Sequence, residues 1–205
     1  MLAGPPPFAA MAACYLYILP LLHEDQAKVG ISVDPLARVR AFSARYYESF
    51  DLPRSVLVGF DSVREARRRE TGLHRRLRQW NAVQPLTVPA VAGGHTEWYR
   101  GVTALLQAEA EQDRALGLDV HLPAGDWWRR RLRQEQALLY EWCEQALRGV
   151  SPDALRSSAQ WRAVVDVLDA WPALGLDLRD ALPADVESAY RDHRRAWSHN
   201  LGEWP

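Results

Sequence analysis

Short apolar runs alternate with segments of helical period along the first hundred residues. An apolar run of this kind is typical of a buried strand, whereas apolar residues three or four positions apart favour a helix. Asp34-Pro35 is a strong helix-start signal and directly precedes one such segment. The pattern predicts strands at Cys14–Leu19, Ala27–Ser32 and Ser55–Phe60, helices at Leu36–Tyr47 and Val63–Gln79, and a short aromatic run at Thr96–Tyr99.

The rest of the chain has the period of helices throughout. Prolines and acidic residues mark the starts of these segments, and glycines mark their ends. The change in pattern places a domain boundary near residue 101. It predicts a loose tail over residues 1–13, an α+β domain over residues 14–100 and an all-α domain over residues 101–205. The expected helices of the second domain are Val102–Leu116, Asp126–Arg148, Asp153–Trp171 and Ala184–Trp197.

Composition narrows the class of protein. The chain has 205 residues, 48% hydrophobic and 25% charged, which is enough to bury a core and excludes a disordered chain. The net charge of −1 excludes a polycation that coats DNA. Residues 1–100 carry a net charge of about +4 and residues 101–205 about −5. Since 24 of the 25 basic residues are arginine, part of this excess reflects coding bias, and only the placement of the arginines is informative.

The cysteines and the N-terminal apolar stretch bear on the compartment. Cys14 and Cys143 lie far apart and form no metal-ligand or disulfide pattern, so we expect a reducing, cytoplasmic setting. The stretch from Phe8 to Leu22 lacks a preceding basic residue, contains Pro20, and is shorter than the roughly 18 residues of a membrane span. We therefore predict a buried strand in this stretch and no association with a membrane.

One predicted helix carries a carboxylate on its apolar stripe. Burying that charge costs several kcal/mol, so Glu70 needs a metal, an arginine or a hydrogen-bond cluster. The alternative is that Glu70 lies at the edge of the stripe and pairs with Arg67 or His74 one turn away. His74 is itself most often a packed or capping histidine. The stripe consists of Ala66, Glu70, Leu73 and Leu77.

The helix that begins at Pro35 carries Arg38 in its first turn. There the side chain can reach a phosphate bound beside the sheet, or it can pair with Asp34 or face solvent. Alternation along the first strand places Tyr15 and Tyr17 on one face. If that face borders a cleft, Tyr17 can meet Arg38 and Glu70.

Taken together, these segments resemble the GIY-YIG nuclease domain. Tyr15-Leu16-Tyr17 stands at the Gly-Ile-Tyr motif, and Lys28-Val29-Gly30 at the Tyr-Ile-Gly motif. Arg38 follows Gly30 by eight residues, as the arginine of the family does, and Glu70 stands at the carboxylate position. His74 and the Thr-Glu-Trp-Tyr run that ends at Tyr99 are similar to the phage-type branch. The chain departs from the pattern at Tyr15, which replaces a glycine, and at Lys28, which replaces the second tyrosine.

The resemblance implies a three-stranded, mostly antiparallel sheet flanked by helices, and a metal-dependent endonuclease that cleaves DNA. It implies that Glu70 binds one Mg²⁺ (or Mn²⁺), that Arg38 stabilises charge on the phosphate, and that Tyr17 acts as a general base or orients the attacking water. Lys28 and His74 complete the implied catalytic set. The candidate contacts to DNA are Arg40, Arg67, Arg68 and Arg75.

Two alternatives stay open at this stage. The chain can instead be a catalytically weak GIY-YIG fold that binds nucleic acid or protein. In the helical region, Trp127-Trp128 followed by arginines resembles a nucleic-acid platform, although core packing with Leu132, Leu139 and Trp142 fits the same residues. The negative charge of residues 101–205 is equally compatible with a protein partner or an inhibitor.

Overall fold

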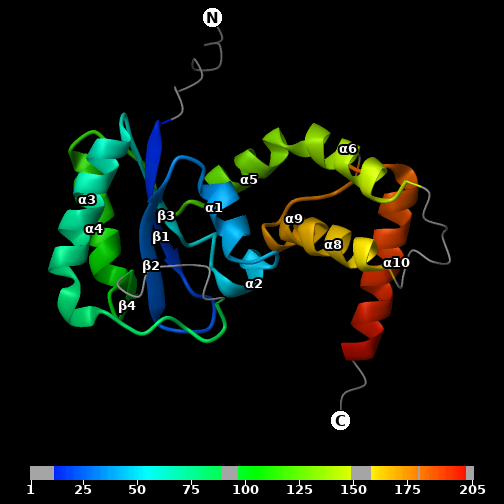
Figure 1. Cartoon of the computed structure of the whole chain (residues 1–205), viewed down its shortest axis with the longest axis horizontal. Coiled ribbons are helices and arrows are strands. Elements are labelled where there is room, and N and C mark those ends of the chain that lie inside the picture. Colours follow the sequence, from blue (N-terminus) through cyan, green and yellow to red (C-terminus); the bar gives the residue numbers. More distant parts are fainter. Residues whose placement is uncertain (1–11, 89–96, 149–157, 180, 202–205) are drawn as a thin grey trace, which may run out of the picture. The chain divides into compact units, whose positions relative to one another are not determined.

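A computed structural model describes residues 12–88, 97–148, 158–179 and 181–201 (Figure 1). The chain divides into two compact units, described separately below. Unit 1 comprises residues 1–43 and 48–124, and unit 2 comprises residues 44–47 and 125–205. Unit 1 thus extends past the boundary that the sequence pattern places near residue 101. The predicted tail over residues 1–13 lies almost wholly outside the described residues.

Unit 1 is an antiparallel sheet with helices on both faces. The expectation of three strands is wrong, because the sheet has five, in the order β4-β2-β1-β3-β5. The additional strands are short edge strands of three residues each, too short to show a two-residue period. The strands are β1 (Cys14–Pro20), β2 (Gln26–Ser32), β3 (Val56–Phe60), β4 (Trp98–Arg100) and β5 (Asp119–His121).

Side-chain caps mark the starts of α1, as Asp34-Pro35 predicted, and of α3. Asp34 accepts a hydrogen bond from the Ala37 amide at the start of α1, and Ser62 accepts one from the Glu65 amide at the start of α3. The single helix expected over Leu36–Tyr47 is wrong, since α1 ends at Phe42 and Ser43 is already extended. The elements are α1 (Pro35–Phe42), α2 (Tyr46–Ser49), α3 (Val63–Arg76), the 3₁₀ turn η1 (Arg78–Trp80) and α4 (Thr103–Ala115).

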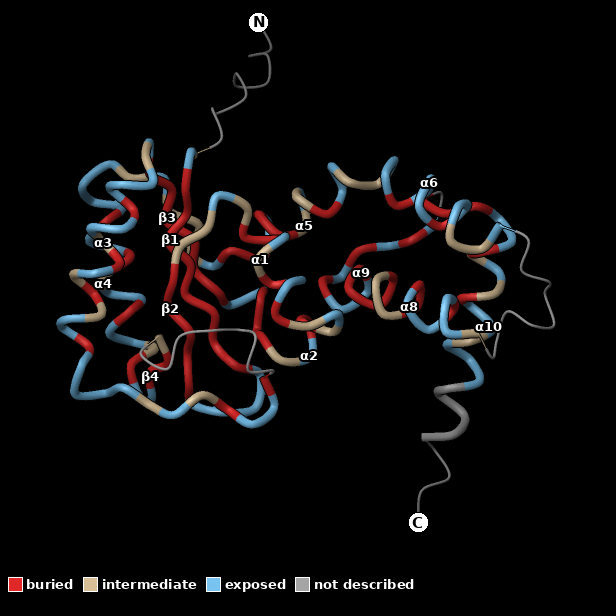
Figure 2. The backbone as a smooth tube through the Cα atoms, in the orientation of Figure 1, coloured by how far each residue is buried: buried red, intermediate tan, exposed pale blue. Residues whose placement is uncertain are grey.

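Alternation along the strands divides unit 1 into two apolar layers. Leu16 and Ile18 of β1 face α3 and α4, which lie on one side of the sheet (Figure 1). Tyr17 faces the opposite side, where α1 packs and the Phe42 ring lies 6.5 Å from the Tyr17 ring. Every residue of β1 is buried, and the helices expose their outer faces (Figure 2). The central strand therefore holds Tyr17 away from solvent.

Unit 2 is helical, as predicted, but two of the expected helices are shorter or divided, and the last one is longer and extends to Leu201. The helix expected over Asp126–Arg148 is interrupted at Glu135, and β5 shows that the second half of the chain is not helical throughout. Residues 153–157 of another expected helix lie outside the described residues. The elements are α5 (Gly125–Gln134), α6 (Gln136–Ala146), α8 (Ala159–Leu168), α9 (Ala170–Ala173) and α10 (Ala184–Leu201). None of the helices in the described residues has both the length and the apolar character needed to span a membrane.

Candidate active site

Tyr17 lies across the one glycine of β2. The register pairs Tyr17 with Gly30, and a methyl group on Gly30 would lie 2.3 Å from the Tyr17 hydroxyl oxygen. Any side chain at this position would collide with the buried ring. Gly30 is therefore required for close approach rather than for an unusual backbone conformation. It lets the tyrosine hydroxyl reach over β2.

Arg38 meets that hydroxyl from α1. Its side chain hydrogen-bonds to Tyr17, and its guanidinium stacks over the Phe42 ring at 4.7 Å. Burial raises the pKa of Tyr17 to about 12, against the opposing effect of Arg38. At neutral pH, Tyr17 is thus a protonated hydroxyl held by a cation.

Lys28 is fully buried on the same side of the sheet. Its Nζ lies 2.6 Å from Glu97 Oε2, and 5.4 Å and 5.1 Å from the ring centres of Phe42 and Trp98. Burial lowers the pKa of Lys28, and the hydrogen bond from Lys28 to Glu97 opposes that shift. The positive charge of Arg38 acts in the same direction as burial. Lys28 is therefore an interior amine coupled to the site, not a surface charge.

Glu70 of α3 is buried with two partners on its own helix. Arg67 Nη1 donates to Glu70 Oε2 at 2.7 Å, and His74 Nε2 lies 3.7 Å from Oε1. Burial raises the pKa of Glu70, but His74 and Arg67 together outweigh it and hold the pKa below its usual value. Glu70 is thus buried on the apolar stripe, and it also pairs with Arg67 and His74 one turn away, so each of the two alternatives from the sequence is correct in part. The result is a charged carboxylate in a protected place.

His74 links Glu70 to β4. Its Nδ1 lies 2.6 Å from the Tyr99 hydroxyl oxygen, and the two rings stack with centres 5.8 Å apart. Burial raises the pKa of Tyr99 to about 12, so this hydroxyl keeps its proton and is available to donate to Nδ1. When the Tyr99 hydroxyl donates to Nδ1, the ring proton of neutral His74 is on Nε2, and this Nε2–H group faces Glu70.

The predicted site residues form two contact groups. Tyr17 and Arg38 touch on the α1 side of the sheet, and Glu70 and His74 touch on the α3 side. The negative charge of Glu70 acts on both Tyr17 and Lys28, which joins the groups electrostatically.

The candidate DNA contacts are divided between two helices. All four are exposed, with Arg40 on α1 and the others, Arg67, Arg68 and Arg75, on α3.

The donor set suits a metal that needs few protein ligands. Within the described residues, no group of three or more His, Cys, Asp or Glu side chains could hold a metal ion. Glu70 alone offers a charged carboxylate among the predicted catalytic residues. Magnesium retains most of its waters and binds through one or two carboxylates, so this single donor fits it.

Sequence reasoning missed two partners in the site, Glu97 and Tyr99. Both lie in the Thr-Glu-Trp-Tyr run, which the sequence indicated only as a strand that closes the sheet. The available signal was the lysine itself, because a lysine inside an apolar strand requires a buried carboxylate nearby.

The tryptophan pair of unit 2 belongs to the core. Trp128 is 0% exposed and Trp127 is 7% exposed, which excludes a stacking platform made by these two rings. Trp142, expected in the core, is 38% exposed.

Residues 14–114 match the model of the T5orf172 domain, a GIY-YIG-related phage domain. This confirms the resemblance at the level of the domain. All predicted catalytic residues lie within the matched range, whereas the helices of unit 2 lie outside it. No curated protein and no solved structure matches the chain.

Proposed function

We propose that the chain is a metal-dependent endonuclease that hydrolyses phosphodiester bonds of DNA through a GIY-YIG-type site. The observation that carries the proposal is the contact between Arg38 and the Tyr17 hydroxyl, with the buried, charged Glu70 within electrostatic reach, inside a T5orf172 domain. The charges of Arg38 and Glu70 act on both Tyr17 and Lys28, which supports one shared site rather than separate structural ion pairs.

Glu70 would hold the metal, Mg²⁺ or Mn²⁺, by displacing Arg67. That exchange is feasible because the Arg67 side chain is 65% exposed and can move into solvent, while the metal would replace it as the counter-charge of the buried Glu70 carboxylate. When bound, the metal would stabilise negative charge on the phosphate oxygens. His74 would hold the carboxylate in place from the other side.

Arg38 and Tyr17 would act on the phosphate and the attacking water. A guanidinium presents paired donors that match two phosphate oxygens, so Arg38 suits the role of phosphate clamp. Tyr17 keeps its proton at neutral pH and would orient the water by a hydrogen bond. It would become a general base once a further cation, together with Arg38 and Lys28, lowers its pKa.

Cleavage of plasmid and single-stranded DNA in the presence of Mg²⁺ or Mn²⁺ tests the proposal. Wild type is compared with Glu70→Ala and with Glu111→Ala, whose exposed carboxylate on α4 provides a matched control. We expect wild type and the control to cleave and Glu70→Ala to lose activity. Equal cleavage by all three proteins would show that Glu70 is not the metal ligand. DNA binding without cleavage by any of them would favour the alternative of a binding module.

A further inference from the structure

Glu97 reaches the candidate active site from the position directly before β4. The Val29 amide of β2 donates a hydrogen bond to the Glu97 carbonyl oxygen at 2.9 Å, which holds this residue against the sheet. The Glu97 carboxylate contacts Lys28 Nζ at 2.6 Å, on the side of the sheet that also carries Tyr17. The side chain of Glu97 is 28% exposed and that of Lys28 is 0% exposed. Glu97 is thus the partly exposed member of an ion pair whose cation lies in the interior.

Lys28 and Arg38 place two positive charges on one aromatic ring. Lys28 Nζ lies 5.4 Å from the centre of the Phe42 ring, and the Arg38 guanidinium lies 4.7 Å from the same centre. Burial and the charge of Arg38 lower the pKa of Lys28, whereas the hydrogen bond to Glu97 and its charge oppose them. Glu70 of α3 also favours the protonated amine, through its charge. Loss of the Glu97 carboxylate would therefore shift Lys28 towards the neutral amine.

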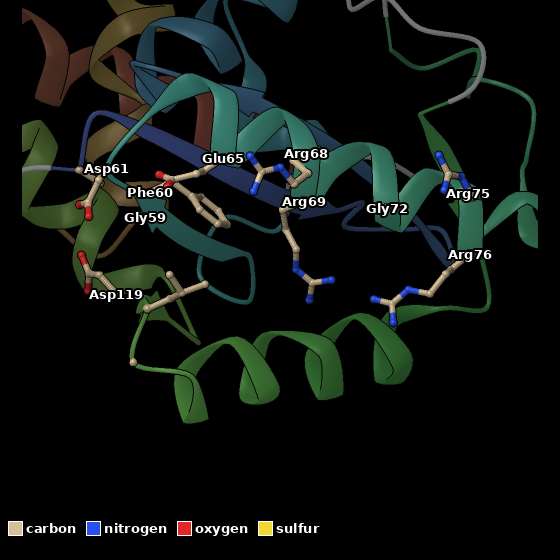
Figure 3. Close-up of a pocket in the computed structure, with 13 residues that line it drawn as sticks. Gly59, Phe60, Asp61, Glu65, Arg68, Arg69, Gly72, Arg75, Arg76 and Asp119 are labelled. Atoms are coloured by element: carbon tan, nitrogen blue, oxygen red, sulfur yellow. The ribbon is translucent and has the colours of Figure 1, made fainter.

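Another ion pair of unit 1, which joins two helices, uses arginine. Figure 3 shows Arg69 extending from α3 towards α4 beside a pocket of about 860 Å³, and Arg69 contacts Asp113 at 2.8 Å. Lys28, in contrast, is the single lysine of a chain with 24 arginines. An amine loses its proton far more readily than a guanidinium. The charge of Lys28 therefore depends on its partner in a way that the charge of Arg69 does not.

Stability alone is a weak reason for the pair of Lys28 and Glu97. A buried ion pair is often no more stabilising than well-packed apolar side chains of the same volume, because both charges must leave water. The rings of Phe42 and Trp98 beside Lys28 Nζ would suit such an apolar side chain. The positive charge itself is thus the feature to explain. Hydrolysis of a phosphodiester gives it a use, because negative charge develops on the phosphate oxygens and nearby cations stabilise it.

We propose that Glu97 is a positioning residue of the cleavage site, whose carboxylate fixes Lys28 as a second cation beside Arg38. The inference rests on the proposed function, and it gives the carboxylate before β4 a role beyond closing the sheet. Glu97 acts through Lys28, and the ammonium group adds its positive charge to that of the guanidinium.

The single lysine makes its protonation directly measurable. Lysine isotopically labelled at Cε gives one lysine signal in the NMR spectrum of the full chain, and its chemical shift reports the protonation of Nζ. The signal is followed from about pH 6 to about pH 10.5 in wild type, Glu97→Gln and Glu97→Asp. Glutamine has the shape of glutamate without the charge, and aspartate keeps the charge on a shorter side chain. The control, Glu24→Gln, removes a partly exposed carboxylate of the same unit that pairs with Arg100 of β4.

We expect the midpoint of the Lys28 titration to fall by about 1–3 pH units in Glu97→Gln, because the ammonium loses an opposite charge at contact distance. Glu97→Asp should show a smaller fall, and the control should titrate like wild type. Thermal melting checks that each variant is folded. An unchanged midpoint in Glu97→Gln, or an equal fall in the control, would overturn the inference. Should Glu97→Gln be unfolded, a wild-type midpoint in Glu97→Asp would overturn it instead.

The pH dependence of cleavage distinguishes a role in the reaction from a role in stability. Besides burial, which is the main cause, the charge of Glu97 raises the pKa of Tyr17, so its removal alone favours a general base. If Lys28 acts as a cation, cleavage by Glu97→Gln should instead fall about tenfold or more, relative to wild type, as the pH rises through the lowered Lys28 midpoint. A loss of cleavage that is equal at every pH would show a merely structural role and overturn the inference.

Failure of this inference and failure of the proposed function are distinguishable. If no protein cleaves DNA but the Lys28 midpoint falls in Glu97→Gln, the proposed function fails and Glu97 stands as the residue that keeps Lys28 charged. If cleavage requires Glu70 and Lys28 titrates alike in wild type and Glu97→Gln, the inference fails alone.

Discussion

At the scale of single residues, the site combines two buried charges of opposite sign, and the sequence predicted them unequally. Glu70 was predictable because its helix has a clear apolar stripe and the carboxylate interrupts it. The burial of Lys28 was not, because its partner Glu97 lies far along the chain and becomes a neighbour only when β4 pairs with β2. Local periodicity carries no information about such a contact.

Gly30 makes the tyrosine geometry testable. A Gly30→Ala substitution places a methyl group 2.3 Å from the Tyr17 hydroxyl oxygen, and the buried ring must move. We expect a loss of about 1–3 kcal/mol in the free energy of unfolding from overpacking, and at least tenfold slower cleavage.

Gly72→Ala provides the control for this substitution. Nothing lies within 4 Å of a methyl group at Gly72, which is inside α3, so this variant should gain about 1 kcal/mol and cleave like wild type. Urea denaturation and cleavage rates measure both effects. Wild-type activity in Gly30→Ala would show that the position of Tyr17 does not matter.

Lys28 should leave a signature in the pH dependence of stability. Its pKa in the folded protein lies below the unfolded value of 10.5, mainly because of burial. Between these two pKa values the unfolded chain binds more protons than the folded one, so stability due to Lys28 rises with pH across that window, at up to about 1.4 kcal/mol per pH unit. Lys28→Met removes this contribution.

Urea denaturation of wild type and Lys28→Met from pH 7 to pH 10.5 measures the effect. The free energy of unfolding of wild type minus that of the variant should increase towards pH 10.5. A constant difference, or one that decreases with pH, would contradict the burial of a protonatable amine at this position.

At the scale of elements, Asp34-Pro35 predicted where α1 begins and the apolar stripe predicted α3, but nothing in the sequence predicted where α1 ends. Ser43 turns to an extended conformation without a glycine or proline to mark it. β5 was missed as a sheet member, and β4 was indicated only through the Thr-Glu-Trp-Tyr run, because three-residue edge strands gain their stability from the pairing partner rather than from their own pattern. The packing of α3 against α4 was likewise invisible, because it depends on ion pairs between helices.

Arg69 should be a main polar contact between α3 and α4. It donates to Asp113 at 2.8 and 3.0 Å, and the Asp113 side chain is only 6% exposed. Arg69→Met leaves this carboxylate buried without its cation, so we expect a loss of about 3–5 kcal/mol in the free energy of unfolding. Arg76→Gln removes a more exposed partner of Glu109 and should cost about 1 kcal/mol or less. Equal losses in urea denaturation would contradict this distinction.

At the scale of the whole molecule, the two units are interleaved along the sequence, because a segment of unit 2 lies between two segments of unit 1. The short segment 44–47 leaves unit 1 and belongs to unit 2. Arg45 Nη1 lies 2.5 Å from Asp166 Oδ1, and Asp169 accepts hydrogen bonds from Arg45 and from Tyr190. A sequence-based boundary cannot show such an exchange, because four residues inside a predicted helix carry no signal of their own. Unit 2 is therefore built partly from residues that interrupt unit 1 along the chain.

This interleaving predicts how a truncated chain behaves. A protein ending at Ala124 retains Arg45, Tyr46 and Tyr47 but lacks Asp166 and Asp169. Because Tyr46 and Tyr47 are buried in the full chain, the truncation should expose two aromatic rings in edge-to-face contact and promote self-association.

Replacing the two rings should reverse that effect, since the defect is attributed to them alone. In the truncated chain, Tyr46→Ser/Tyr47→Ser should restore a monomer in light scattering and lower the binding of an apolar dye, while leaving unfolding in urea unchanged. In the full chain the same pair of substitutions should destabilise unit 2, because there the rings are part of its interior. A truncated chain that is monomeric without these substitutions would contradict the prediction that exposure of the two rings promotes self-association.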